Sequence, residues 1–148
     1  MKKWKTLAAD TIAIGLALSA FTAVAEDHPY TEGAVVNVAA IRTEYGRFDD
    51  YMKFLSTNWK QAEEAEKKAG LILSYKVLQV EPRGPDDPDL YLVVTYKNWA
   101  ALDGLRDKQE AILAQVYGSM HAAQQGAVDR GKIRRALGSS TMQELVLK

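Results

Sequence analysis

The sequence predicts an α+β fold, in which a four-stranded antiparallel sheet carries two helices on one face in the order βαββαβ. Residues 70–99 contain two apolar runs rich in β-branched and aromatic residues on either side of a proline-rich connector, which is the pattern of a β-hairpin. A long helical pattern precedes this hairpin and another follows it, and a further strand pattern lies at each end of the domain. Because the connections in this order are right-handed, both helices are expected on the same side of the sheet.

The first 25 residues are typical of a cleaved secretory signal. Three of the first five residues are lysines, an apolar segment spans residues 11–24, and Ala-Val-Ala at 23–25 places small residues before Glu26. The alternative is a membrane anchor, which needs an apolar run of roughly 20 residues. This run is shorter and contains Ser19 and Thr22. We therefore expect a periplasmic or secreted protein with no membrane attachment after cleavage.

Composition limits the classes of partner. Without residues 1–25 the chain loses three lysines and one aspartate, so that acidic residues exceed basic residues by two. This balance gives no electrostatic reason to expect nucleic acid as a partner. The sequence has no Cys, which excludes disulfides, thiol chemistry and Cys-ligated metals. After a flexible lead-in at 26–33, residues 34–148 are expected to form one domain.

The first strand and the first helix follow this lead-in. Residues 34–42 (AVVNVAAIR) are apolar on both alternating faces, as in a strand that is covered on both sides. From Gly46 an apolar stripe recurs at spacings of three and four residues, and Gly70 suits the left-handed conformation that ends a helix. These features predict a strand at 34–42 and a helix between the two glycines whose stripe faces the sheet.

The two hairpin strands, at about 71–80 and 90–96, also carry apolar side chains on both faces. Two helices on one side cover only one face of such a sheet. The other face is expected to pack against a second subunit. The sequence therefore predicts a homodimer.

The connector at 81–89 holds three of the four prolines of the chain and is longer than an ordinary hairpin loop. A lid and a solvated turn are both open interpretations of this segment. Asp86, Asp87 and Asp89 lie within it, but they lack the glycine and the distal glutamate of a calcium-binding loop. We therefore predict no metal site.

The second helix and the last strand complete the domain. Asn98 suits the N-cap of this helix, whose apolar stripe continues to about residue 123 with a bend expected at Gly104. Glycines at 126 and 131 each lower helix stability by about 1 kcal/mol relative to alanine. A basic cluster at 132–135 is expected to be solvated or to cap the helix end. The last strand is expected at about 141–147.

In this order of elements the chain resembles the dimeric α/β barrel superfamily of ferredoxin-like domains, which includes the antibiotic-biosynthesis-monooxygenase-like proteins. The resemblance covers residues 34–148, and VVTYKNWAALDGL at 93–105 is similar to the junction between a strand and a helical turn in that superfamily. Members include cofactor-independent quinone-type monooxygenases, haem-degrading enzymes and lactone isomerases, so the fold alone assigns no activity. The resemblance implies a ligand pocket between the helices and the sheet.

Two polar residues are the candidates for catalysis in such a pocket. Asn37 is a polar side chain inside an otherwise apolar strand, and a buried amide without partners costs about 1 to 3 kcal/mol. His121 lies at the edge of the apolar stripe of the second helix, where an imidazole is able to act as an acid, a base or a ligand. The structural alternatives are an amide satisfied by backbone or by the partner subunit, and a half-buried histidine that packs.

Aromatic residues that suit an aromatic pocket are the candidates for ligand binding. For each, a place in the core or in the dimer interface is the alternative. The four candidates are Trp59, Tyr75, Tyr91 and Trp99.

The sequence is compatible with three functions. It does not decide whether the protein is an enzyme. The first is an exported protein that binds or converts a small apolar or aromatic compound without a tightly bound cofactor. The second is a non-catalytic dimeric packing or interaction module, which the absence of clustered titratable groups favours. The third is haem binding or degradation, since the resembling enzymes combine an Asn on the first strand with a Trp and a His on the second helix. Asn37 matches in kind, whereas Trp99 and His121 are 22 residues apart, which is farther than in those enzymes.

Overall fold

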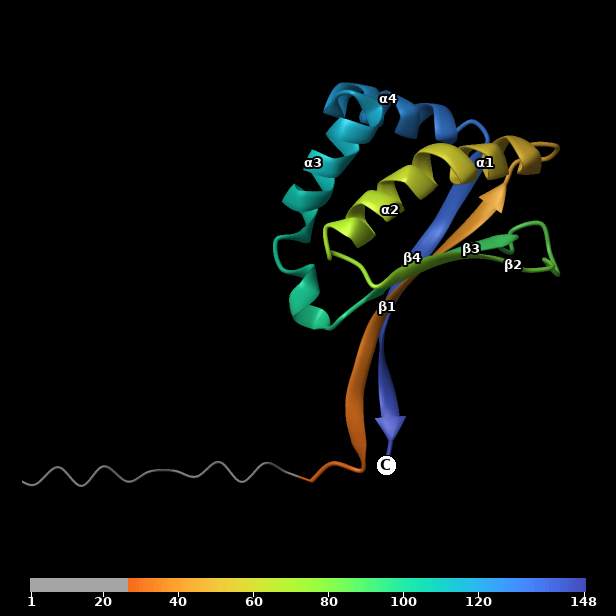
Figure 1. Cartoon of the computed structure of the whole chain (residues 1–148). Coiled ribbons are helices and arrows are strands. Elements are labelled where there is room, and N and C mark those ends of the chain that lie inside the picture. Colours follow the sequence, from red (N-terminus) through yellow and green to blue (C-terminus); the bar gives the residue numbers. More distant parts are fainter. Residues whose placement is uncertain (1–26) are drawn as a thin grey trace, which may run out of the picture.

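The structure is a computed structural model that describes residues 27–148 (Figure 1). The predicted secretory signal at 1–25 lies outside the described residues. None of the described helices is both long enough and apolar enough to cross a membrane. In chain order the elements are β1 (Tyr30–Thr43), α1 (Phe48–Phe54), the π-helical segment η1 (Leu55–Trp59), α2 (Lys60–Lys68), β2 (Ser74–Gln79), β3 (Leu90–Tyr96), the 3₁₀ segment η2 (Trp99–Leu102), α3 (Leu105–Tyr117), α4 (Met120–Arg130) and β4 (Arg134–Leu147).

The four strands form one antiparallel sheet in the order β2-β3-β1-β4. The helices lie on one side of this sheet, and the beginning of β1 and the end of β4 extend together beyond them (Figure 1). A βαββαβ chain whose first and third strands are central is the ferredoxin-like arrangement. The predicted α+β fold class is therefore confirmed.

The strand register separates the two faces of the sheet. Val35 and Ile41 of β1 are buried and pair with the buried residues Tyr96 and Leu90 of β3. Directly paired residues in an antiparallel sheet point to the same face. The odd-numbered residues of β1 and the even-numbered residues of β3 therefore form the helix face. The even-numbered residues of β1, such as Val36, and the odd-numbered residues of β3 form the opposite face, which we call the open face.

The core under the helices has two parts. One cluster joins Val35 and Tyr96 to Ile72 and to Leu105 at the start of α3. The other cluster joins Ile41 and Leu90 to side chains of the first helical segment, by which we mean α1, η1 and α2 together. These side chains include the buried Tyr51 and Leu55. These contacts fix both helical segments to the sheet through side chains on the helix face.

The outer strands are longer than expected. β1 begins at Tyr30 rather than at residue 34, so that the end of the predicted lead-in at 26–33 is part of a strand, with Tyr30 paired to Leu147. β4 begins at Arg134 rather than at about 141. The two strands pair along almost their whole length, and Gly138 (φ +133°) lies beside an irregularity in the register at Ala40/Ile41. The backbone hydrogen bonds of this ladder outweigh weak local strand preferences.

The helical segments follow the positions of glycine. Gly46 and Gly70, with φ of +72° and +73°, flank the first helical segment, as the sequence predicts. The second segment is not one bent helix but three pieces, because Gly104 (φ +60°) and Gly118 (φ +81°) adopt left-handed conformations. Ser119 then caps α4, its hydroxyl accepting a hydrogen bond from the Ala122 N–H at 3.1 Å.

Candidate functional site

A cavity of about 400 Å³ lies between the helices and the helix face of the sheet. Its floor is formed by residues of β1, β3 and β4, and its walls come from both helical segments. Much of the wall is aromatic. The aromatic side chains are Tyr51, Phe54, Trp59 and Tyr117.

The aromatic wall is held in place by packing within the first helical segment and against β2. Tyr51, which is only 1% exposed, stacks on Phe54 with ring centroids 5.9 Å apart and planes inclined by 19°. Trp59 meets the ring of Tyr75 edge-on, at a centroid distance of 5.3 Å. The helical spacing of Tyr51, Phe54 and Trp59 brings them onto the face that is turned towards the sheet. The cavity therefore has a flat, rigid apolar side that suits a planar compound.

Two arginines also line the cavity. Arg130 ends α4, and its guanidinium carbon lies 4.7 Å from the centroid of the Phe54 ring. Arg134 begins β4, where its pairing with Thr43 places it on the helix face, and its guanidinium carbon lies 5.8 Å from the centroid of the Tyr51 ring. Arginine side chains commonly stack on aromatic rings in this way. The cavity is thus apolar on one side and cationic on another.

These arginines influence the phenol of Tyr51. Burial raises the pKa of Tyr51, and the nearby positive charges of Arg134 and Arg130 oppose that increase. The phenol is therefore neutral at physiological pH and is available as a hydrogen-bond donor.

A separate group of buried polar side chains lies between α2, α3 and β3. Glu63 and Glu66 are 8% and 4% exposed, and the amide of Gln109 donates a hydrogen bond to Glu66 Oε2 at 2.9 Å. Burial, and then the neighbouring Glu66, raise the pKa of Glu63 to about 8. Burial followed by the two carboxylates raises the pKa of Tyr96 to about 12. The raised pKa values keep Glu63 and Tyr96 largely protonated at neutral pH.

The structure places the six residues proposed from the sequence in different environments. Of these, Trp59 lines the cavity. Tyr75 packs against Trp59, and its hydroxyl donates a hydrogen bond to Glu64, which raises the pKa of Tyr75 to about 12. Tyr91 pairs with Ala40 and therefore lies on the open face, away from the cavity. Trp99 is 47% exposed at the start of η2, and its indole N–H donates to Gln143 Oε1 at 2.9 Å.

The two polar candidates do not line the cavity. Asn37 lies on the helix face two residues before Ala39, which lines the cavity. The Asn37 side chain donates a hydrogen bond to Thr141 of the neighbouring strand β4. His121 is exposed on the first turn of α4. The Asn, Trp and His on which the haem hypothesis depends are therefore not among the residues that form the cavity.

Sequence reasoning missed the two cavity arginines. The basic cluster at 132–135 is interpreted from the sequence as solvated or capping a helix end, as short basic clusters usually are, and the strand is expected only from about 141. A strand that begins at Arg134 places Arg134 and Arg135 on opposite faces. Alternation of side chains along an extended β4 was the signal that could have identified Arg134.

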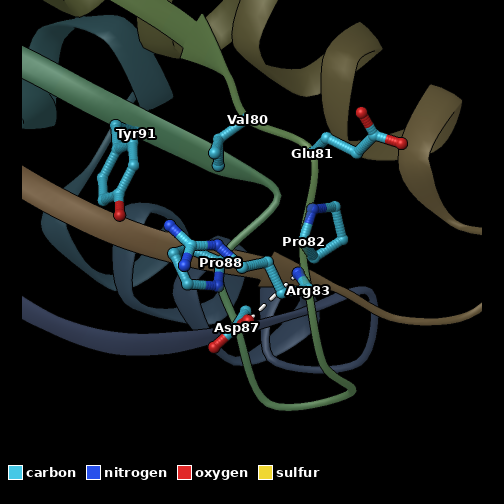
Figure 2. Close-up of a pocket in the computed structure, with 7 residues that line it drawn as sticks. All are labelled: Val80, Glu81, Pro82, Arg83, Asp87, Pro88 and Tyr91. Atoms are coloured by element: carbon cyan, nitrogen blue, oxygen red, sulfur yellow. Dashed lines mark hydrogen bonds between the residues drawn. The ribbon is translucent and has the colours of Figure 1, made fainter.

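A second, smaller pocket of about 250 Å³ lies at the connector between β2 and β3 (Figure 2). Pro82 and Pro88 stand on either side of it, and Tyr91 borders it from the open face. The Asp87 carboxylate accepts a hydrogen bond from the Arg83 backbone N–H at 3.0 Å. This acidic side chain is therefore used within the loop itself.

The connector is tied to the body of the domain. Asp89 accepts hydrogen bonds from the backbone N–H and the hydroxyl of Thr43, and its own backbone N–H donates to the Ile41 carbonyl at 3.0 Å. Arg135 of β4 forms an ion pair with Asp86 at 3.3 Å. Within residues 27–148, no group of three or more His, Asp or Glu side chains is placed to hold a metal ion.

Comparisons with known proteins concern the fold alone. No protein-family model matches the chain, and no curated protein matches it. Protein SO0527 from Shewanella oneidensis is 14% identical with a TM-score of 0.48, over 79% of this chain and 96% of its own. HapK from Hahella chejuensis is 9% identical with a TM-score of 0.45, over 74% and 91%. A dimeric ferredoxin-like protein from an uncultured marine organism is 14% identical with a TM-score of 0.48, over 80% and 98%.

Proposed function

We propose that this protein binds a small aromatic compound in the cavity between the helices and the sheet. The observation that carries the proposal is the wall of four aromatic side chains around a space of about 400 Å³. Ligand sites for small molecules are usually cavities of roughly 300 to 1,000 Å³ lined by apolar and aromatic groups with a few polar ones. A fused two-ring compound fits within this range.

The expected affinity is modest. A ligand of about 13 non-hydrogen atoms that gains roughly 0.5 kcal/mol per atom binds with a Kd on the order of 10 μM. Such binding is measurable by isothermal titration calorimetry. The two probes we choose are 2-naphthoate and its neutral analogue 2-naphthamide.

The tryptophans supply a matched test. Trp59→Leu removes part of the aromatic wall, whereas Trp99→Leu removes an exposed indole outside the cavity. We expect the Trp59 variant to weaken binding of both probes by about tenfold, because stacking and burial on a large aromatic surface are lost. The Trp99 variant is expected to bind as the unmodified protein does. If neither probe binds to the unmodified protein, or if both tryptophan variants lose binding equally, the proposed site is wrong.

The assembly we propose is a homodimer in which the open faces pack against each other. Leu78, Leu137 and Met142 are 45%, 38% and 50% exposed. Leu78 and Met142 pair with Tyr91 and Val36 and so lie on the open face. A second copy that covers about 800 Å² of this face would form an interface of standard size. This apolar face also favours the interaction-module hypothesis, which needs no ligand.

We further propose that the protein is exported. The lysines and the apolar segment of the first 25 residues support this proposal, as does the Ala-Val-Ala sequence before Glu26.

A further inference from the structure

Arg134 has a buried hydrogen-bond donor that is not used. Its Nε is inaccessible to solvent and has no hydrogen-bond partner among residues 27–148. A buried donor of this kind, attached to a charged group, carries the full cost of its desolvation. The stacking of Arg134 on Tyr51 holds the guanidinium at the cavity but does not satisfy the N–H.

Arg130 adds a second positive charge at the same cavity. Its Nη1 donates to the hydroxyl of Tyr117 at 3.3 Å, which is a long hydrogen bond. Neither Arg130 nor Arg134 forms an ion pair with a carboxylate of the described chain. Two cations that line the same cavity without a carboxylate partner favour an anionic ligand there.

The nearest competing explanation is the carboxylate of Asp89, whose charge is felt by Tyr51. However, both oxygens of Asp89 accept hydrogen bonds from Thr43, and no ion pair joins Asp89 to Arg134. Asp89 therefore stabilises the end of the connector and forms no ion pair with Arg134.

From this geometry we infer that the aromatic ligand of the cavity is a carboxylate, bound by Arg134 with support from Arg130. This inference rests on the proposed function and adds to it the charge of the ligand. The two terminal nitrogens of a guanidinium form a fork that matches the two oxygens of a carboxylate. The aromatic rings that line the cavity hold the planar body of the same molecule.

The test compares 2-naphthoate with 2-naphthamide, which have the same shape but differ in charge. The unmodified protein is expected to bind naphthoate about tenfold more tightly, because hydrogen bonds to a charged acceptor are stronger than those to a neutral one. In Arg134→Met, which keeps an unbranched apolar stem but removes the guanidinium, this preference is expected to fall to within about threefold. Arg134→Lys keeps the charge but lacks the fork, and it is expected to retain part of the preference.

Arg135→Met is the matched control. Arg135 is the next residue, but it lies on the open face and is paired with Glu44 and Asp86 at 3.5 and 3.3 Å. This variant changes the net charge equally and is expected to keep the preference for naphthoate. If it loses the preference as Arg134→Met does, a diffuse positive field explains the result and the inference is overturned.

The outcomes separate the two proposals. Equal binding of both probes that still depends on Trp59 overturns the carboxylate inference and leaves the aromatic site in place. Absence of binding by both probes overturns the proposed function itself. If circular dichroism shows that Arg134→Met does not fold, Arg130→Met replaces it, and an unchanged preference in that variant overturns the shared role of the two arginines.

Discussion

The side-chain amide of Asn37 donates a hydrogen bond to the hydroxyl oxygen of Thr141 at 2.9 Å and so joins the central strand β1 to the edge strand β4. The two residues are directly paired in the sheet. The amide of Asn37, a candidate catalytic group in the sequence, therefore has a hydrogen-bond partner within the fold. Removal of this amide is expected to affect the stability of the protein.

Asn37→Ala is expected to lower the free energy of unfolding by about 1 kcal/mol, because one hydrogen bond between strands is lost. Chemical denaturation of the single variants, of Thr141→Val and of the double variant would give the coupling energy between the two side chains. We expect a coupling of roughly 0.5 to 1 kcal/mol and an affinity for naphthoate within about twofold of the unmodified protein. A large loss of affinity without loss of stability would make Asn37 a ligand-binding residue after all.

Stability is expected to fall as the pH rises from about 4.5 to about 8. Glu63 has its pKa raised from 4.5 to about 8 in the folded protein, so between these values the folded state holds a proton that the unfolded state has released. The stabilisation is complete below the unfolded pKa and is lost as the pH passes through the folded value. Glu63→Gln removes this dependence and should increase the free energy of unfolding at pH 8 by roughly 2 to 4 kcal/mol relative to the unmodified protein.

Denaturation curves at pH 5 and pH 8 would measure this difference. Glu81→Gln is the control, since Glu81 is an exposed carboxylate on the connector and its replacement changes the net charge equally. It should leave the pH dependence intact. A pH profile that is the same in all three proteins would mean that Glu63 does not hold the proton.

The open face is expected to hold the dimer together. Met142→Glu places a charge on this face and should produce a monomer, because a charge without a partner in an apolar interface is strongly unfavourable. Val128→Glu is the control, since Val128 is 61% exposed on α4, on the helical side of the sheet. Analytical ultracentrifugation should find twice the monomer mass for the unmodified protein and for the control. A monomeric unmodified protein at micromolar concentration would disprove the proposed assembly.

Export is expected to leave a chain that begins at Glu26. Replacement of Ala23 and Ala25 by bulky residues should block cleavage, because signal peptidase requires small side chains at these positions. Mass spectrometry of the periplasmic and extracellular fractions would identify the first residue. An intact N-terminus in those fractions would contradict the proposal.

Much of the fold was predictable because its signals are local. The alternating apolar runs of the hairpin predict β2 and β3, and Gly46 and Gly70 predict the limits of the first helical segment. The bounds of the outer strands were not predictable in the same way. Apart from Leu137, residues 134–140 are polar or small and carry little strand preference of their own. They become a strand because they pair with β1 along the sheet edge.

The candidate site was predictable only in its position. The resemblance implied a cavity between helices and sheet, and Trp59 is the proposed residue that lines it. The other aromatic side chains of the cavity, Tyr51, Phe54 and Tyr117, belong to helices, and no pattern in the sequence distinguishes them from ordinary packing residues. Asn37 and His121 were singled out for their chemistry, but neither lines the cavity.

The sequence by itself determined the order of the elements and the presence of apolar side chains on both faces of the sheet. These properties depend on neighbours along the chain, where periods of two and of three to four residues reveal the exposed and buried sides. Only the tertiary structure decided that Arg130 and Arg134 lie beside Phe54 and Tyr51. The residues of each pair are about 80 positions apart in the sequence. They meet because β4 pairs with β1, which brings the end of α4 and the start of β4 next to the first helical segment.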